Sequence, residues 1–229
     1  MIRHLKRVVS PVFWKAGRKN FLWITHPNPG PHAAKMSIPL QVLVRDVLKL
    51  TKTGREARAV IRAGQVLIDG VKRNDHKFPV GLMDVITFPA LKQQYRTVPY
   101  EKGLRVVEIS AADAKLKPVR VVSKQLISGG KTQVTTHDGR NYLGVDAAIG
   151  DTLLLSENKV KEIIKMEPGK LCLVFRGRQA GRIGKLLKFE GSPKNSGLAQ
   201  LEGNKETFEA PVNYLMVIGD KEPVVNVNA

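Results

Sequence analysis

The fold of this chain is decided by Thr53-Gly54-Arg55-Glu56-Ala57-Arg58-Ala59-Val60-Ile61-Arg62-Ala63-Gly64 and the residues that follow it. At about 100° per residue, a helix here gathers its apolar side chains on one face, at Ala57, Val60 and Ile61. Its three arginines fall within another narrow arc, at Arg55, Arg58 and Arg62. Thr53 and Glu56 have the spacing of a capping box, and Gly64 stands where a helix would end. The stretch predicts a helix that buries one face and offers the other to a partner.

The residues after this helix predict a strand and a tight turn. Residues 65–68 favour a strand, Asp69-Gly70 supplies the turn, and Val71-Lys72-Arg73 continues the chain with two cations. Arginines at helical spacing suit phosphate oxygens, because a guanidinium donates two parallel charge-assisted hydrogen bonds. A solvated basic face would have the same pattern, so this stretch alone leaves both interpretations open.

A second amphipathic segment precedes the arginine helix. Its apolar residues share one helical face after Pro39, at Leu40, Leu43, Val44, Val47 and Leu48, with Arg45 and Lys49 opposite. The order of helix, loop, arginine helix, strand and turn, with a later strand at residues 85–88, resembles the alpha-L RNA-binding domain. The matching residues are Arg55-Glu56-Ala57, Ile61, Gly64, Val66-Leu67-Ile68-Asp69-Gly70 and Val71. The resemblance implies two helices on a small sheet with a basic face for structured RNA. This module also occurs in enzymes, so it does not by itself identify the function.

Composition points to a polyanionic partner. The 229 residues carry 38 basic and 20 acidic side chains, for a net charge of +18. The excess of basic over acidic residues is +8 in residues 1–50 and only +2 in residues 151–229. This gradient predicts that a polyanion is contacted most heavily at the N-terminal end. Nucleic acid fits better than an anionic membrane, because the sequence has no apolar run of spanning length and no signal-peptide core.

The cysteine and histidine residues argue against disulfides, zinc and thiol chemistry. Cys172 is the single cysteine, so intramolecular disulfides are impossible and the reducing cytoplasm is expected. Its apolar neighbours predict a buried core residue rather than a nucleophile. The five histidines have no companions at metal-ligand spacing, so we expect no metal and no cofactor.

Residues 1–37 form a basic arm without a single acidic residue. Its cations are interleaved with four aromatic residues, Phe13, Trp14, Phe21 and Trp23, and Pro27-Asn28-Pro29-Gly30-Pro31 follows. Because the cations repel one another, we expect an extended arm that orders on RNA, with aromatics available for base stacking or anchoring. The alternative is that the two tryptophans pack onto the next domain.

The rest of the chain predicts β structure. Short apolar runs separated by Gly129-Gly130, Asp138-Gly139 and Gly150-Asp151 predict a mainly-β central domain. After Pro168-Gly169, two apolar strands at residues 171–175 and 183–189 flank a loop with glycines at 177, 181 and 184. This segment resembles the KOW motif, a hairpin within the SH3-like barrels of ribosomal and transcription-elongation proteins. The expected fold is α+β and multi-domain: an arm at 1–37, an alpha-L domain at 38–97, a central domain at 98–168 and a KOW barrel at 169–229.

Three alternatives, a phosphate-binding loop, an RNA-modifying enzyme and a transcription-elongation factor, explain less of the sequence. Ser128-Gly129-Gly130-Lys131-Thr132 echoes a phosphate-binding loop, but Gln125 stands where that pattern needs glycine, so we expect a hairpin turn. An RNA-modifying enzyme, such as a pseudouridine synthase, would need a catalytic segment around an aspartate that this chain lacks. A transcription-elongation factor would leave the basic arm and the alpha-L module unexplained. We therefore expect no enzyme.

The order of the modules resembles one family in particular. The motifs are His4-Leu5-Lys6-Arg7, Pro29-Gly30-Pro31-His32, Ser37-Ile38-Pro39-Leu40, Arg45-Asp46-Val47-Leu48 and Asp75-His76-Lys77-Phe78-Pro79-Val80-Gly81-Leu82-Met83-Asp84-Val85-Ile86. Together they resemble the small-subunit ribosomal protein family S-four-e, in a compact form like the archaeal members. The resemblance implies a structural role in translation in the cytoplasmic ribosome. It implies ribosomal RNA and neighbouring ribosomal proteins as partners, and no membrane or small-molecule substrate.

Three basic surfaces are the candidate RNA-binding sites. In the arm they comprise Arg3, His4, Lys6, Arg7, Lys15, Arg18, Lys19 and Lys35. On the alpha-L domain they comprise Arg45, Lys52, Arg55, Arg58, Arg62, Lys72, Arg73 and Lys77. In the KOW loop they comprise Arg176, Arg178, Arg182 and Lys185. We expect these cations to contact phosphates of several RNA strands.

Overall fold

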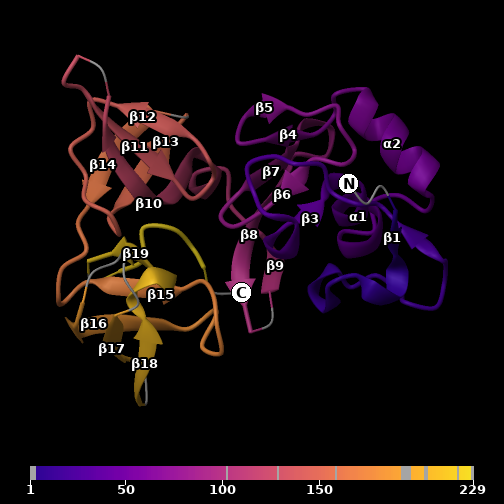
Figure 1. Cartoon of the computed structure of the whole chain (residues 1–229). Helices are drawn as coiled ribbons and strands as arrows, with labels where there is room; N and C mark the ends of the chain where they lie inside the picture. The colour runs from indigo at the N-terminus through magenta and orange to yellow at the C-terminus, as the bar shows by residue number, and fades with distance from the viewer. Residues whose placement is uncertain are drawn as a thin grey trace. The chain divides into compact units, whose positions relative to one another are not determined.

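The protein divides into two compact units. The computed structural model describes residues 4–101, 103–127, 129–157, 159–191, 197–203, 206–220 and 222–227. Unit 1 comprises Met1–Thr97 and Lys102–Ser110, and unit 2 comprises Val98–Glu101 and Ala111–Ala229 (Figure 1). The chain is mostly β with few helices, and the longest described helix has nine residues. Both α and β elements are thus present, as expected.

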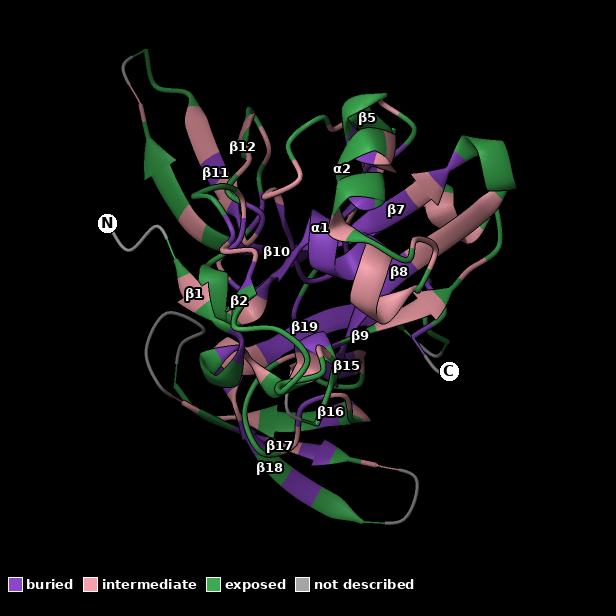
Figure 2. Cartoon of the chain, turned by 90° about the vertical axis from the view of Figure 1, so that its right-hand side faces the viewer, coloured by how far each residue is buried: buried purple, intermediate pink, exposed green. Residues whose placement is uncertain are grey.

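Two short helical segments form the middle of unit 1. Helix α1 (Leu40–Val42) continues directly into a wider π-helical turn, η4 (Leu43–Val47), and its residues Leu40 to Val44 are buried. Helix α2 (Gly54–Arg62) follows and buries Ala57 and Ile61. Figure 2 shows the contrast, with α1 mainly buried and α2 mainly exposed. The predicted pair of helices is confirmed, although η4 departs from ordinary α-helical geometry.

An antiparallel sheet packs with these helices in unit 1. Its strand order is β5 (Val71–Lys72), β4 (Leu67–Ile68), β7 (Val85–Phe88), β8 (Gln93–Tyr100) and β9 (Gly103–Glu108). Strands β3 (Ile38–Pro39) and β6 (Pro79–Val80) form a separate short pair. Asp69 and Gly70 have φ angles of 50° and 77°, which is the left-handed pair that a two-residue hairpin turn requires. The predicted strand–turn–strand is therefore present.

The arm is folded onto unit 1. Strands β1 (Leu5–Lys6) and β2 (Trp23–Ile24) pair antiparallel, and the 3₁₀ turns η1 (Arg7–Val9) and η2 (Val12–Trp14) connect them, with η3 (Ala34–Met36) further along. Trp14 is only 1% exposed, whereas Trp23 is 52% exposed. The expectation of an extended arm does not describe this structure, since the buried Trp14 ties the arm to its own protein.

Unit 2 contains two five-stranded antiparallel sheets. The first has the order β12 (Asn141–Leu143), β11 (Thr132–Thr136), β10 (Leu116–Leu126), β13 (Thr152–Ser156) and β14 (Lys159–Ile164). The second has the order β18 (Thr207–Pro211), β17 (Leu198–Glu202), β16 (Ile183–Phe189), β15 (Leu171–Val174) and β19 (Leu215–Gly219). Each sheet has its own apolar cluster, one around Val119 and Leu153 and the other around Cys172 and Leu215.

The chain passes between the two units more than once near residue 98, because Val98–Glu101 belongs to unit 2 and Lys102–Ser110 belongs to unit 1. Strand β9 lies next to β8 in the sheet of unit 1, because Ile109 N donates a 2.9 Å hydrogen bond to Gln94 O. The run at residues 104–109 is thus a strand, as predicted, but it extends the sheet that carries the helices. The Gly-Gly segment at 129–130 forms the β10–β11 hairpin turn, where Ile127 N donates to Lys131 O at 3.0 Å.

Candidate nucleic-acid interface

Helix α2 presents the predicted arginine face. Arg55, Arg58 and Arg62 are exposed, while Ala57 and Ile61 point into the core. The capping box is complete, since Glu56 N donates to Thr53 Oγ1 at 3.2 Å and Thr53 N donates to Glu56 Oε2 at 3.3 Å. Hydrogen bonds from the Lys52 backbone and from Thr53 lower the pKa of Glu56. The one acid of this helix is therefore engaged at its start, and the exposed arginine stripe has no carboxylate of its own helix beside it.

The cations that flank α2 differ in exposure. Lys52 and Lys72 are exposed, whereas Arg73 and Lys77 are half-buried. The Arg73 guanidinium lies 4.5 Å from the centre of the Phe78 ring, which supports its stem and orients the charge. Arg45 is also half-buried, so α2 with Lys52 and Lys72 forms the most accessible part of this surface.

The loop between β15 and β16 presents a second basic surface. Arg176, Arg178 and Arg182 of this loop are exposed, as is Lys185 of the following strand β16. The Arg176 guanidinium lies 5.4 Å from the centre of the Tyr214 ring, and Arg182 lies 5.7 Å from that of Phe208. The loop depends on glycine as predicted, because Gly177 and Gly181 have φ angles of 92° and 89°. Gly184 is instead required by close packing, since a Cβ at this position would lie only 3.0 Å from Leu201 Cβ.

Most of the arm cations lie at the surface. His4, Lys6, Lys15, Arg18, Lys19 and Lys35 are exposed, and Arg3 lies outside the described residues. These exposed cations extend over the whole arm, from strand β1 to the turn η3. The arm therefore presents a third basic surface, to which buried Arg7 does not contribute.

Arg7 occupies a different environment from the one predicted. Its side chain is buried, with Nη1 donating to Gly17 O at 2.9 Å and Nη2 lying 3.6 Å from Asp46 Oδ1. Arg45 contacts the other oxygen of the same carboxylate at 2.7 Å. Asp46 is the first acidic residue of the sequence. It forms ion pairs with both Arg7 and Arg45, two residues that were predicted to bind phosphate. Arg7 is a structural residue here because it lies within the fold and faces a carboxylate.

Further contacts hold the arm together and attach it to the rest of unit 1. Trp14 Nε1 donates to Ser37 O at 2.8 Å inside the core. Thr25 Oγ1 donates to Gln41 Oε1 at 2.9 Å, and Asn28 N donates to Lys77 O at 2.9 Å. The arm therefore belongs to the same folded unit as α2. The sequence does not predict these hydrogen bonds, because they join neutral groups that are far apart along the chain.

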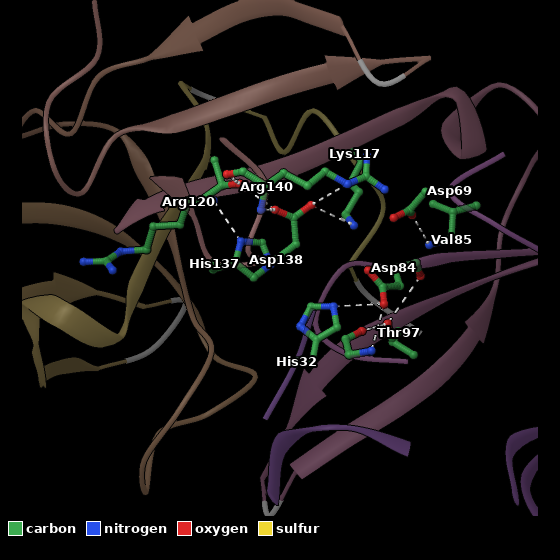
Figure 3. Close-up of polar contacts among 12 residues, drawn as sticks. His32, Asp69, Asp84, Val85, Thr97, Lys117, Arg120, His137, Asp138 and Arg140 are labelled. Atoms are coloured by element: carbon green, nitrogen blue, oxygen red, sulfur yellow. Dashed lines mark hydrogen bonds and ion pairs between the residues drawn. The ribbon is translucent and has the colours of Figure 1, made fainter. Parts of the chain in front are cut away.

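A buried histidine–aspartate pair is the last of these contacts between the arm and the rest of unit 1 (Figure 3). His32 Nε2 lies 3.0 Å from Asp84 Oδ2, and both side chains are buried. Asp84 also accepts a 2.8 Å hydrogen bond from Gly81 N, and a Cβ on Gly81 would overlap the His32 ring. The sequence motifs around His32 and Gly81 are among those that carry the family resemblance. In the structure they join the arm to the sheet.

Unit 2 contains a buried charge cluster that sequence reasoning missed (Figure 3). Asp138 Oδ2 lies 3.4 Å from Lys117 Nζ and 3.5 Å from Arg140 Nε, and Thr136 Oγ1 donates to its other oxygen. Burial alone would raise the pKa of Asp138, but the Lys117 charge and the Thr136 hydrogen bond lower it overall. The sequence predicts only a turn at Asp138-Gly139, because no sequence spacing links this aspartate to Lys117.

The remaining predictions concern the thiol, metals and membranes. Cys172 is fully buried in the apolar cluster of its sheet, and burial raises the pKa of its thiol to about 12, as expected of a core residue. Among the described residues, no grouping of histidine, cysteine and carboxylate side chains could hold a metal ion. No helix in the described parts of the chain is long and apolar enough to cross a membrane.

Comparison with known proteins identifies the family. Residues 1–35 match the RS4NT domain, residues 38–86 the S4 domain, and residues 91–163 the model of ribosomal family S4e. The small ribosomal subunit protein eS4 of Methanothermobacter thermautotrophicus is 42% identical over 98% of this chain and 96% of its own length. The chain belongs to the ribosomal S4e family. The eS4 protein of Korarchaeum cryptofilum is 41% identical, again over 98% of this chain and 97% of its own.

A solved S4e structure agrees with this assignment. The crystal structure of the 30S ribosomal protein S4e from Thermoplasma acidophilum is 31% identical in sequence and superposes with a TM-score of 0.71. The match covers 81% of this chain and 96% of the other. The S-four-e resemblance predicted from the motifs is therefore confirmed, and the relatives are archaeal S4e proteins, as the compact form indicated. The S4e family is a family of structural ribosomal proteins rather than enzymes.

Proposed function

We propose that this S4e protein is a non-catalytic constituent of the small ribosomal subunit that binds ribosomal RNA in the cytoplasmic ribosome. The names of its relatives support this role, since each is a small ribosomal subunit protein over nearly the full length of this chain. The observation that carries the RNA-binding part is the exposed stripe of Arg55, Arg58 and Arg62 within the matched S4 domain. Neighbouring ribosomal proteins are further partners.

We propose that the finer architecture consists of the predicted modules. We assign the alpha-L fold to the unit built around α1, α2 and the sheet of β4 and β7. The sheet of β15 to β19 is assigned as the KOW barrel, with its basic loop at the β15–β16 connection. Glycines of positive φ at 177 and 181 support that assignment, because a KOW hairpin needs a tight loop.

RNA would be held by charge at three surfaces. They are the α2 stripe with Lys52 and Lys72, the exposed basic residues of the arm, and the β15–β16 loop cations Arg176, Arg178 and Arg182 with Lys185 of β16. Guanidinium groups suit this task, because they pair with phosphate oxygens in a bidentate geometry. Half-buried Arg45, Arg73 and Lys77 stay in the proposed set, whereas buried Arg7 is left out of it.

Two measurements test the function. Sedimentation of a cell extract through a sucrose gradient should show stable comigration with the small subunit, and a protein confined to the top of the gradient would contradict the assignment. The purified chain should bind small-subunit ribosomal RNA with a steep salt dependence. The logarithm of affinity should fall by about 0.7 to 0.9 per phosphate for each tenfold rise in salt. A slope near zero would rule out the electrostatic mechanism.

A further inference from the structure

The two-stranded ribbon of the arm has an outer face that contributes nothing to the core. Strands β1 and β2 pair with Lys6 opposite Trp23 and Leu5 opposite Ile24. Ile24 is buried, while Lys6 and Trp23 are exposed, because successive residues of a strand point to opposite faces. His4 adds a second ring, with its centre 5.6 Å from that of Trp23 and the planes tilted by 54°. An indole, an imidazole and an ammonium group thus share one exposed surface.

We propose that this face is a stacking site for an unpaired base of ribosomal RNA, with Trp23 as the platform and Lys6 on the adjoining phosphate. The inference deepens the proposed function and rests on it. Bases splayed out of loops and bulges stack on aromatic side chains, and every base has a π-face that such a ring can cover. A positively charged group beside the ring matches the phosphate that accompanies each base.

Charge favours RNA over a protein as the occupant. The sequence has no acidic residue before Asp46, and Asp46 is held by Arg7 and Arg45. Among the exposed aliphatic side chains of the arm, Val8, Val9 and Val12 belong to the connecting turns η1 and η2, and Leu22 directly precedes strand β2. Within the paired residues of the ribbon, the exposed side chains are a cation and an aromatic ring, Lys6 and Trp23, and no carboxylate of the arm opposes a phosphate there.

The platform is in place before any ligand binds. Ile24 anchors β2 in the core, and Arg7 N donates to Leu22 O at 2.9 Å on the other side of Trp23. The buried Arg7 guanidinium also lies 5.4 Å from the centre of the neighbouring Phe21 ring. A rigid backbone reduces the entropy lost on binding, so most of the stacking energy remains available. This gives buried Arg7 a positioning role for the RNA face that it does not itself contact.

Trp23→Phe and Trp23→Leu, compared in the full-length chain, test the proposal. Affinity for purified small-subunit ribosomal RNA should stay within about twofold for Trp23→Phe, which keeps an aromatic face. Trp23→Leu keeps apolar surface without that face and should bind about 5- to 100-fold more weakly. Its salt slope should be unchanged, whereas Lys6→Ala should lower the slope by about 0.7 to 0.9. Leu91→Ala is the matched control, since Leu91 is also 52% exposed, and it should bind like wild type.

Tryptophan fluorescence gives an independent readout. The chain has two tryptophans, and Trp14 is buried, so RNA should quench only the Trp23 emission. Quenching in wild type that disappears in Trp23→Phe supports stacking. Equal affinity of Trp23→Leu and Trp23→Phe, or emission unchanged by RNA, would overturn it and leave the face as a protein contact. A wild-type chain that fails to bind RNA would instead contradict the proposed function itself. Unchanged thermal midpoints in the variants exclude misfolding.

Discussion

Helix α2 and the start of the arm are both rich in basic residues, yet their arginines have opposite environments. Arg58 lies at the surface, and its Nε donates only to Gly54 O of its own helix, at 3.1 Å. Arg7 is buried against Gly17 O and the Asp46 carboxylate. The difference teaches that a basic residue cannot be identified as RNA-binding from the sequence alone. The deciding factor is whether the fold brings a carboxylate within reach.

The energetics explain why the two environments stay distinct. An unpaired charge inside a protein loses its hydration at a cost of several kcal/mol, so Arg7 can be buried only with Asp46 and a carbonyl beside it. The α2 arginines keep their guanidinium groups in water, and the nearest acid of that helix, Glu56, is engaged in the cap. Their charge therefore remains available to a phosphate.

The largest expected effect is on RNA binding by α2. Replacing Arg55, Arg58 and Arg62 together with alanine should weaken binding roughly 100- to 500-fold at 0.1 M salt and lower the salt slope by about 2 to 3. The free energy of unfolding should change by less than about 0.5 kcal/mol for each residue, because all three are exposed. A large loss of stability with unchanged binding per folded molecule would show instead that these arginines are packing residues.

The opposite result is expected for the buried arginine. Arg7→Ala should lower the free energy of unfolding by about 3 kcal/mol, because it removes a buried side chain that hydrogen-bonds Gly17 O and lies beside the Asp46 carboxylate. Urea denaturation measures the loss, with exposed Arg18→Ala as the control that should stay near wild type. Limited proteolysis of the free wild-type chain should leave residues 4–37 intact and should cut them in the variant. An arm of the wild-type free protein that is cleaved rapidly would restore the view that it orders only on RNA.

The buried Asp138 cluster of unit 2 offers the matching test for a buried carboxylate, as Arg7 does for a buried guanidinium. Asp138→Asn should destabilise the protein by about 2 kcal/mol at pH 7, since Lys117 and Arg140 would lose their shared charge partner. The folded pKa of Asp138 lies below its ordinary value of 3.8, so its contribution is fully present above that pH. It is lost as the pH falls through the folded pKa. Denaturation curves of the two proteins should therefore converge in acid, and a constant gap would contradict the pKa shift.

The smallest effect concerns the start of the arginine helix. Thr53→Ala removes the hydroxyl that accepts from Glu56 N and should cost about 1 kcal/mol. Thr53→Ser keeps an accepting oxygen and should lower the free energy of unfolding by only a few tenths of a kcal/mol. Thermal denaturation compares the two. Equal loss in both variants would show that the methyl group, rather than the cap, carries the effect.

Local patterns predicted much of the fold. The capping box, the buried positions Ala57 and Ile61 and the Asp69-Gly70 turn all follow from spacings of a few residues. The strand at 183–189 was likewise predicted with its observed limits. The π-helical turn at Leu43–Val47 was not, because an apolar face of helical spacing does not distinguish α from π geometry.

The sequence by itself determined the local elements, the basic character of the surfaces and, through its motifs, the family. Only the tertiary structure decided which cations are exposed, that Trp14 is core while Trp23 is surface, and that Asp138 meets Lys117. The reason is physical. Helical and strand periodicity act over a few residues, whereas Arg7 and Asp46, or His32 and Asp84, are brought together by chain packing over about 40 to 50 residues. Burial of a charge depends on that long-range partner, which no local pattern records.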